Sequence, residues 1–346
     1  MLHKIKNQID KELKSFIRKT DKIYSLSKIS PLLFKHLREF VLRDGKRVRP
    51  ILFITAYLGF AKKAAANLYS SAIGIELLHD FLLIHDDIID KSDTRRNKPS
   101  LHAMFNNYLA SYKNIKFNGQ DLAIVGGDVL YAISLLAFLS IKEERKRKEE
   151  ALKKFIESVM YTGGGEFIEL IYGLKDIKKI TKQDIIKVYD YKTARYTFAF
   201  PLSMGAILAG ANQKQTEKLF QYGICLGRAF QIKDDLISMF KNKKEIGKSP
   251  LTDLKEAKKT LIIWYAYNHT ENNNKQLIRI IFSKKDADKQ DLSKIQEIIV
   301  ASGALKYAEE EISRLIQQAQ ILLNATAMKL CHKESLNTFI EELLNI

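Results

Sequence analysis

Residues 81–90 read FLLIHDDIID, an apolar run that ends in three aspartates. In a helix, Asp86 and Asp90 lie on one face about one turn apart, with Asp87 beside them. Carboxylates held this close repel one another, and a divalent cation between them removes the repulsion. Mg²⁺ prefers such oxygen ligands, usually one or two carboxylates together with phosphate groups. The stretch therefore predicts a helix whose acidic end binds cations.

The composition favours one helical domain. The chain has 346 residues, 46% of them hydrophobic, and only five prolines. No Pro/Gly/Ser-rich linker divides it, and the long stretches rich in Leu, Ile, Ala, Lys and Glu favour helices. We therefore expect a single all-α domain over residues 1–346.

The net charge of +17 is compatible with a nucleic acid, a membrane surface or a small polyanionic substrate as partner. The charge runs at residues 142–148 and 241–244 are more simply explained as a solvated helix face and a loop. Cys225 and Cys331 lack metal-site or disulfide spacing, which favours a reducing cytoplasm.

The longest apolar run, residues 122–140, is close to membrane-spanning length. Asp128 lies near its middle, so we expect a buried core helix and no integral membrane segment. The N-terminus lacks a signal-peptide core. Apolar residues at three-to-four spacing between Leu2 and Ile17 predict an amphipathic helix there.

Residues 45–50 read GKRVRP before an apolar run, so Lys46, Arg47 and Arg49 crowd a helix entrance. Cations there oppose the helix dipole unless an anion binds. A solvent-facing basic turn is the alternative. In the same way, Arg95 and Arg96 after the aspartates are either salt-bridge partners or bidentate hydrogen-bond donors to phosphate oxygens.

The second half of the chain has its own acidic pair, Asp234 and Asp235 in FQIKDD, at the end of an apolar helix. Glycines 163–165 inside a helical pattern indicate a close approach of backbone, neighbour or ligand. Lys192 and Thr193 open or interrupt a further apolar helix. Two acidic segments among basic residues suit a substrate that carries phosphates through several metal ions.

With these motifs in order, the chain resembles the trans-isoprenyl diphosphate synthase (polyprenyl synthetase) family from Gly45 to about residue 319. The resemblance implies a homodimeric all-α bundle of about ten or more helices around a central cavity. It implies a cytoplasmic prenyltransferase of isoprenoid biosynthesis that condenses isopentenyl diphosphate with allylic diphosphates. Nucleic acid is not an expected partner.

The resemblance also assigns roles by position. Three Mg²⁺ ions would be held by Asp86, Asp87, Asp90, Asp234 and Asp235, of which the first four are, with Lys192, the expected catalytic residues. The allylic diphosphate would contact Arg95, Lys192, Thr193, Gln231, Lys248 and Lys258. Isopentenyl diphosphate would be held by Lys46, Arg49, His79 and Arg96, although a lone histidine in a helix is more often structural.

Product length is a steric matter in this family, since the chain grows away from the aspartates. Phe81 lies about one and a half turns before Asp86 and resembles the floor of short-chain synthases, whereas Leu82 is not aromatic. The combination resembles archaeal-type geranylgeranyl diphosphate synthases, with farnesyl diphosphate as the alternative product.

Departures from the family pattern leave other functions open. Ser238 replaces a third acid of the second motif, Glu166 and Glu169 replace an amide and an aspartate, and Ala257 replaces a common glycine before Lys258. A weakly active subunit of a heteromeric synthase is therefore an alternative. A terpene cyclase-like enzyme needs no isopentenyl site, and a nucleic-acid-binding helical protein gives the aspartates no role.

Overall fold

The computed structural model describes residues 2–240, 251–284 and 286–344, and these form two compact units. The first comprises residues 1–152, 204–211 and 329–335, and the second comprises residues 153–203, 212–328 and 336–346. Helices α8 (Arg145–Gly173), α10 (Phe200–Leu208) and α18 (Leu330–Leu344) belong in part to each unit. The expectation of one domain over residues 1–346 stays a prediction.

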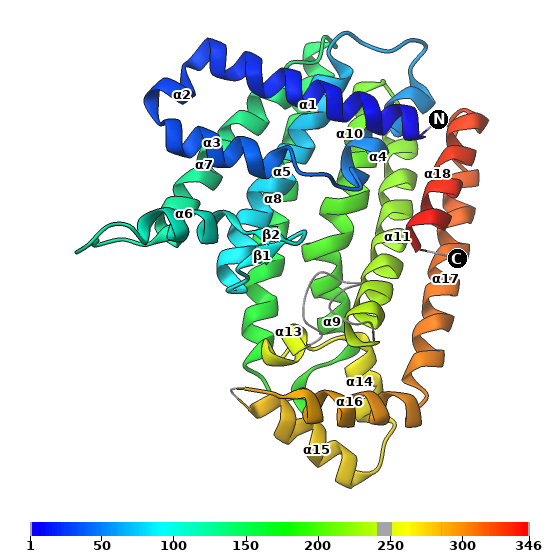
Figure 1. Ribbon diagram of the computed structural model, residues 1–346. Coiled ribbons are helices and arrows are strands. Elements are labelled where there is room, and N and C mark those ends of the chain that lie inside the picture. Colours follow the sequence, from blue (N-terminus) through cyan, green and yellow to red (C-terminus); the bar gives the residue numbers. More distant parts are fainter. Residues whose placement is uncertain (1, 241–250, 285, 345–346) are drawn as a thin grey trace. The chain divides into compact units, whose positions relative to one another are not determined.

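The first unit is built around helix α5 (Figure 1). Its helices are α1 (Leu2–Tyr24), α2 (Leu26–Ile29), α3 (Pro31–Val41), α4 (Val48–Phe60), α5 (Leu68–Ile89), α6 (Leu101–Leu109) and α7 (Gly119–Phe138). Residues 71–78 of α5 are all buried, and the helix packs on α1, α4, α6 and α7. At Gly74 a Cβ atom would lie 2.6 Å from the backbone nitrogen of Phe138, so α5 and α7 approach at a distance that only glycine allows.

Helix α7 is the core helix expected from the apolar run at residues 122–140. Among the described helices it alone is long and apolar enough to cross a membrane, with a mean hydropathy of 1.7, and 44% of that window is buried. It begins at a capping box between Asn118 and Asp121 and packs on α5 and α6. A core helix passes the same test of length and composition, and this packing fits that interpretation.

The second unit is built around helix α11. Its other elements are η1 (Ile177–Lys179), α9 (Lys182–Val188), η2 (Tyr189–Ala199), α13 (Leu251–Lys255), α14 (Leu261–Asn268), α15 (Asn272–Ser283), α16 (Lys289–Ala301) and α17 (Ala304–Asn324). Helix α11 (Gln213–Phe240) packs on η2, α14 and α17. Element η2 is a π-helix, in which hydrogen bonds span five residues instead of four.

The all-α prediction is confirmed, with two differences. Two-residue strands, β1 (Thr94–Arg95) and β2 (Lys98–Pro99), form a small antiparallel hairpin after α5. From about residue 261 onward the apolar spacing predicts two or three amphipathic helices, whereas the described residues there form five. The expectation was too low because local caps divide this part of the chain, including the Asp288 capping box and Gly303 at φ 77°.

Candidate active site

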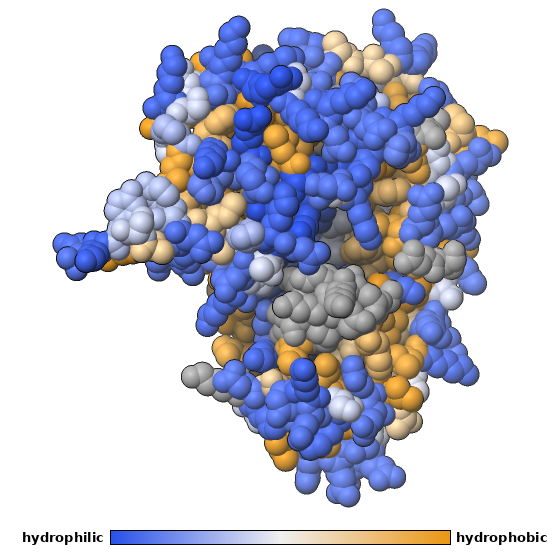
Figure 2. Space-filling view, in the orientation of Figure 1, coloured by the Kyte–Doolittle hydropathy of each residue, from blue (hydrophilic) through white to orange (hydrophobic). Residues whose placement is uncertain are grey.

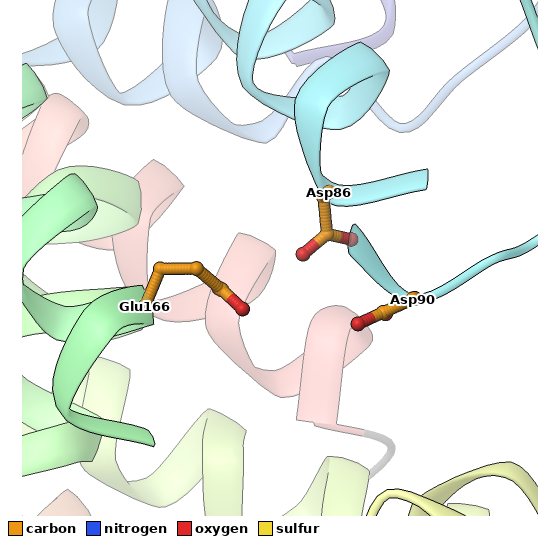
Figure 3. Close-up of side chains that lie close together, drawn as sticks. All are labelled: Asp86, Asp90 and Glu166. Atoms are coloured by element: carbon orange, nitrogen blue, oxygen red, sulfur yellow. The ribbon is translucent and has the colours of Figure 1, made fainter. Parts of the chain in front are cut away.

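The acidic end of α5 places its three aspartates in two different environments. Figure 3 shows Asp86 on α5 and Asp90 at the C-cap of this helix, with their carboxylates turned to the same side, and Glu166 on α8. Asp86 and Asp90 are both partly buried. Asp87 is fully buried and its Oδ1 accepts hydrogen bonds from Arg95 Nε at 2.8 Å and Nη2 at 2.5 Å. Arg95 Nη2 also lies 3.0 Å from Asp86 Oδ2.

The hairpin that holds Arg95 is a feature that the sequence analysis missed. Arg96 and Asn97 form its turn at φ 56° and 58°, the left-handed conformation that two-residue hairpin loops require. The buried Arg43 ties the hairpin to α3, since its Nη2 donates to Pro99 O at 2.8 Å and to Glu39 Oε2 at 2.6 Å. Asparagine before a lysine and proline was the local signal, because asparagine tolerates the left-handed region.

The four residues predicted for isopentenyl diphosphate all belong to the first unit, and the charges of two of them act on His79. Arg96 Nη1 donates to Asp44 O at 3.0 Å, and its guanidinium lies against Gly45, next to the exposed Lys46. Burial and the positive charges of Arg49 and Arg96 hold the pKa of His79 well below its usual range. Arg49, His79 and Arg96, with Lys46 beside them, form what we call the basic corner.

Arg47, the remaining cation of the basic segment, has a structural position. Its Nε lies 2.9 Å from Asp10 Oδ1 on α1, and its Nη1 lies 2.8 Å from Glu76 Oε1 on α5. Its Nη2 donates to Arg43 O at 2.7 Å, and the residue is only 3% exposed. The surrounding carboxylates raise the pKa of Arg47 against the effect of burial, so it stays charged. Arg47 thus joins α1 and α5 at the entrance of α4.

In the second unit, Lys192 is held between two glutamates. Its Nζ lies 2.6 Å from Glu166 Oε2 and 2.5 Å from Glu169 Oε2. A Cβ atom at Gly165 would lie 2.5 Å from Lys192 N, so the glycine allows α8 to touch η2. The predicted close approach is confirmed at Gly165. No such neighbour lies within 4 Å of the Cβ positions at Gly163 and Gly164.

A chain of hydrogen bonds connects η2 to the second acidic motif. Thr193 Oγ1 donates to Gln231 Oε1 at 2.7 Å, and Gln231 Nε2 donates to Asp235 Oδ1 at 2.9 Å. Tyr189 donates its hydroxyl proton to Asp235 Oδ2 and accepts a bond from Leu261 N at 2.9 Å. Burial and Asp235 raise the pKa of Tyr189, which keeps the hydroxyl a donor.

This chain of hydrogen bonds gives the two acids of the FQIKDD motif different environments. Asp235 is buried and fixed on both oxygens, whereas Asp234 is exposed. No local pattern indicates Tyr189, because a tyrosine 46 residues from Asp235 acquires its role only when η2 packs on α11. Ser238 is partly buried on the same helix.

The lysines predicted after the second motif have different outcomes. Lys258 Nζ lies 2.7 Å from Glu256 Oε2, a partner that the sequence analysis did not foresee. Ala257, where the family commonly has glycine, has φ 52°, a left-handed backbone conformation that favours glycine. Lys248 lies outside the described residues.

The proposed product floor includes a residue from another helix. The Phe81 ring lies 4.7 Å from the His85 ring on α5 and 5.2 Å from the Tyr131 ring on α7, measured between centroids. Leu82 is partly buried beside it. Tyr131 could not be found from the sequence, because its contact with Phe81 depends on how α5 packs on α7.

The donor chemistry of the α5 aspartates fits a hard divalent cation. Asp86 and Asp90 present carboxylate oxygens from adjacent turns, and Asp87 holds a guanidinium that also reaches Asp86. In the second unit, Asp234, Glu166 and Glu169 are further carboxylates within reach of solvent. Each of the two units therefore carries acids that suit Mg²⁺.

Comparison with known proteins places these residues in a family. The profile of the polyprenyl synthetase family matches residues 30–299. The chain belongs to this family. A short chain isoprenyl diphosphate synthase from Methanocaldococcus jannaschii is 30% identical over 305 residues, which cover 88% of this chain and 84% of that protein.

Two further relatives agree with this assignment. Geranylgeranyl diphosphate synthase from Saccharolobus solfataricus is 29% identical over 313 residues, covering 88% of this chain and 85% of the relative. The crystal structure of geranylgeranyl pyrophosphate synthase from Corynebacterium glutamicum, complexed with isoprenyl diphosphate and magnesium, aligns with a TM-score of 0.89 at 26% identity over 99% of each chain. The polyprenyl synthetase is thus a trans-prenyltransferase of the short-chain type.

Proposed function

We propose that this polyprenyl synthetase condenses isopentenyl diphosphate with allylic diphosphates and makes geranylgeranyl diphosphate as its main product. Farnesyl diphosphate is the alternative product. The observation that carries condensation, rather than ionisation of a single diphosphate, is the basic corner. Arg49 and Arg96 act on His79 there, while the α5 aspartates hold their own cation, Arg95. The positive charge of Arg95 also acts on His79, so the two groups of charges are neighbours, and each group suits one diphosphate.

Different residues of the first unit would then bind the two diphosphates and the metal ions. In the basic corner, guanidinium groups bind phosphate oxygens in bidentate fashion. His79 is neutral there and donates a hydrogen bond from the single N–H of its ring. Asp87 holds Arg95 beside Asp86, where its guanidinium can contact the allylic diphosphate. Asp86 and Asp90 would hold Mg²⁺, and we propose the same for Asp87, whose Oδ1 binds Arg95.

In the second unit, Lys192 and Thr193 would contact the allylic diphosphate from η2. Glu166 and Glu169 fix the Lys192 ammonium, and Gln231 fixes the Thr193 hydroxyl. We propose that Asp234 and Asp235 complete the metal ligands and that Lys258 and Lys248 add positive charge.

Three Mg²⁺ ions, when bound, would supply positive charge to the departing diphosphate. The chain's own cations stabilise the same charge, which is the kind of preorganised electrostatic effect that dominates many enzymatic rate accelerations. The allylic cation left behind is attacked by the double bond of isopentenyl diphosphate, and the released diphosphate takes the proton. No dedicated general base is therefore needed.

Product length would be limited by Phe81 together with Tyr131 and Leu82. An aromatic pair from two helices fills the space where a growing chain would pass the α5 turns before Asp86. Rings packed in this way yield less readily than one flexible side chain. A closed floor at this depth suits a short product.

We further propose one isoprenoid-synthase-like domain over residues 1–346 that works as a cytoplasmic homodimer. Within the second unit, α8 exposes an apolar stripe at helical spacing: Ile156, Met160, Phe167 and Leu170. Within the first unit, α7 exposes Ile124, Val125 and Leu136. Exposed apolar stripes on a soluble enzyme mark candidate subunit interfaces.

One experiment tests the activity. Purified protein is incubated with Mg²⁺, labelled isopentenyl diphosphate and each of dimethylallyl, geranyl and farnesyl diphosphate, and the product lengths are resolved by chromatography. We expect a C20 main product from each primer and no product when Mg²⁺ is chelated. Absence of condensation with every primer would refute the proposal.

A second candidate is a weakly active subunit of a heteromeric synthase. It is favoured by the two glutamates that contact Lys192, because they neutralise its ammonium more than one carboxylate would. With the family's usual amide at position 166, only Glu169 would contact it. This candidate predicts slow turnover by the protein alone and fast turnover of Glu166→Gln. Size-exclusion chromatography of the active species distinguishes a homodimer from a dependent subunit.

A further inference from the structure

The exposed surface of the N-terminal helices α1–α3 is almost uniformly basic. Between residues 2 and 40 the exposed charged side chains are nine cations and a single acid, Glu39. The exposed cations are Lys4, Lys11, Lys14, Arg18, Lys19, Lys22, Lys28, Lys35 and Arg38. Figure 2 shows mainly hydrophilic side chains over these helices, with small hydrophobic spots between them.

The acids of the same segment are turned to the protein. Asp10 is paired with the buried Arg47, and Glu12 accepts a hydrogen bond from Ser70 Oγ at 2.6 Å. Asp21 accepts bonds from Ser27 N at 2.7 Å and Ser27 Oγ at 2.9 Å. These contacts leave the cations without exposed acidic neighbours on α1 and α2.

Most of the cations of α1 form one continuous stripe. Lys11, Lys14, Arg18 and Lys22 follow the spacing i, i+3, i+7 and i+11, which places them on one side of the helix. The packing face of α1, with Ile9 and Leu13 among its members, is fully buried in the first unit. The stripe is therefore held at a fixed orientation, unlike the cations of a mobile tail.

An apolar tip lies at the end of this stripe. Ile23, Tyr24 and Ile29 are 70%, 48% and 76% exposed. Ser25, at φ 54°, ends α1 and starts α2, and the Asp21 bonds to Ser27 fix the turn between the two isoleucines. Three large apolar side chains are thus presented within seven residues and flanked by lysines.

We propose that the stripe and the apolar tip form a docking surface for an anionic lipid bilayer. Lysine and arginine stripes bind acidic headgroups, and isoleucine and tyrosine side chains insert at the headgroup boundary. The combination favours a membrane over a nucleic acid, because a phosphate backbone gives exposed isoleucines no partner. The surface belongs to the first unit alone and does not depend on the condensation reaction proposed above.

The test is co-sedimentation with vesicles of phosphatidylcholine, with or without 30% phosphatidylserine, at about 0.15 M salt. We expect the full chain to bind only the anionic vesicles. Each neutralised cation near a membrane lowers the partition coefficient about five-fold, so the triple variant Lys14→Gln, Arg18→Gln, Lys22→Gln should lose about 100-fold.

A matched control keeps the net charge constant between variants. The triple variant Lys62→Gln, Lys63→Gln, Lys142→Gln removes three exposed lysines of the first unit outside α1–α3 and should bind like the parent. Equal losses in the two triple variants would show a general charge effect and overturn the proposal. Both should keep the parent's condensation rate without vesicles, which separates docking from catalysis and from misfolding.

The double variant Ile23→Ser, Ile29→Ser tests the apolar tip separately. It should weaken vesicle binding several-fold at unchanged charge and leave any binding of double-stranded DNA unaltered. Vesicle binding equal to the parent, together with DNA binding that depends on the stripe, would identify a nucleic-acid surface and refute the membrane proposal.

Discussion

Replacement of Arg47 by methionine should destabilise the first unit strongly while leaving the predicted anion ligands in place. The Arg47 and Glu76 side chains are each 2% exposed, and their atoms are 2.8 Å apart. Removal of one partner from such a buried pair costs about 3–5 kcal/mol, because the other charge is left without compensation. The Asp10 side chain is 29% exposed, so its share is about 1 kcal/mol or less.

The assay is unfolding by heat and by urea, followed by circular dichroism. With an unfolding entropy of about 2.1 cal/mol/K per residue, the loss corresponds to a Tm decrease of about 4–7 °C. The double variant Arg47→Met, Glu76→Met should recover most of the loss, since a buried ion pair replaced by apolar groups is often neutral. Lys46→Met is the matched control, because Lys46 is exposed and should keep the parent's Tm.

The result that would refute this reasoning is equal stability of Arg47→Met and Lys46→Met. It would mean that Arg47 contributes no more than a surface charge. A double variant that is no more stable than Arg47→Met would contradict the role of Glu76 in particular. Condensation measured on the folded fraction should change far more in Lys46→Met than in the double variant.

Four further outcomes test other parts of the structure. Asp86→Ala should lower kcat/KM about 10³-fold or more through lost electrostatic stabilisation, and near-normal turnover would exclude a metal-binding role. Phe81→Ala should shift products beyond C20 in chromatography, and an unchanged length would remove it as the floor. Ala257→Gly should raise the free energy of unfolding by about 1 kcal/mol by relieving the left-handed backbone, and a loss in urea titration would contradict this. The pKa of His79 is lowered on folding, so below about pH 6.5 the unfolded chain binds more protons than the folded chain. The free energy of unfolding therefore falls as the pH decreases there, by at most about 1.4 kcal/mol per pH unit. His79→Gln should abolish this part of the pH dependence, and the same pH dependence in the variant and the parent would contradict the prediction.

Much of the fold followed from periodicity. The helix at the N-terminus, the helix that ends in three aspartates and the apolar core helix all appear near their predicted bounds. They were predictable because each has one dominant pattern of buried residues along a long helix. The hairpin at residues 94–99 and the short helices after residue 260 were not, because their ends depend on local turns and caps.

The site was predictable as a set of charged residues but not as a set of contacts. The family resemblance predicts that Lys192 contacts a diphosphate, and the structure shows Glu166 and Glu169 on its ammonium. Tyr189 and Tyr131 had no local signal, since each acquires a partner only through helix packing. Arg47 looked like one more anion ligand until its two acidic partners came from α1 and α5.

The π-helical element η2 makes one region of the gene unusually sensitive to changes in length. Each hydrogen bond of a π-helix spans one residue more than in an α-helix, so an in-frame deletion of a single codon within residues 189–199 would shift the register of these bonds. One residue corresponds to a rotation of about 100°. Such a deletion would therefore turn either Lys192 away from its glutamates or the buried Phe198 and Ala199 out of the core. The connection between α6 and α7, exposed over most of its length, should accept the same deletion with little effect.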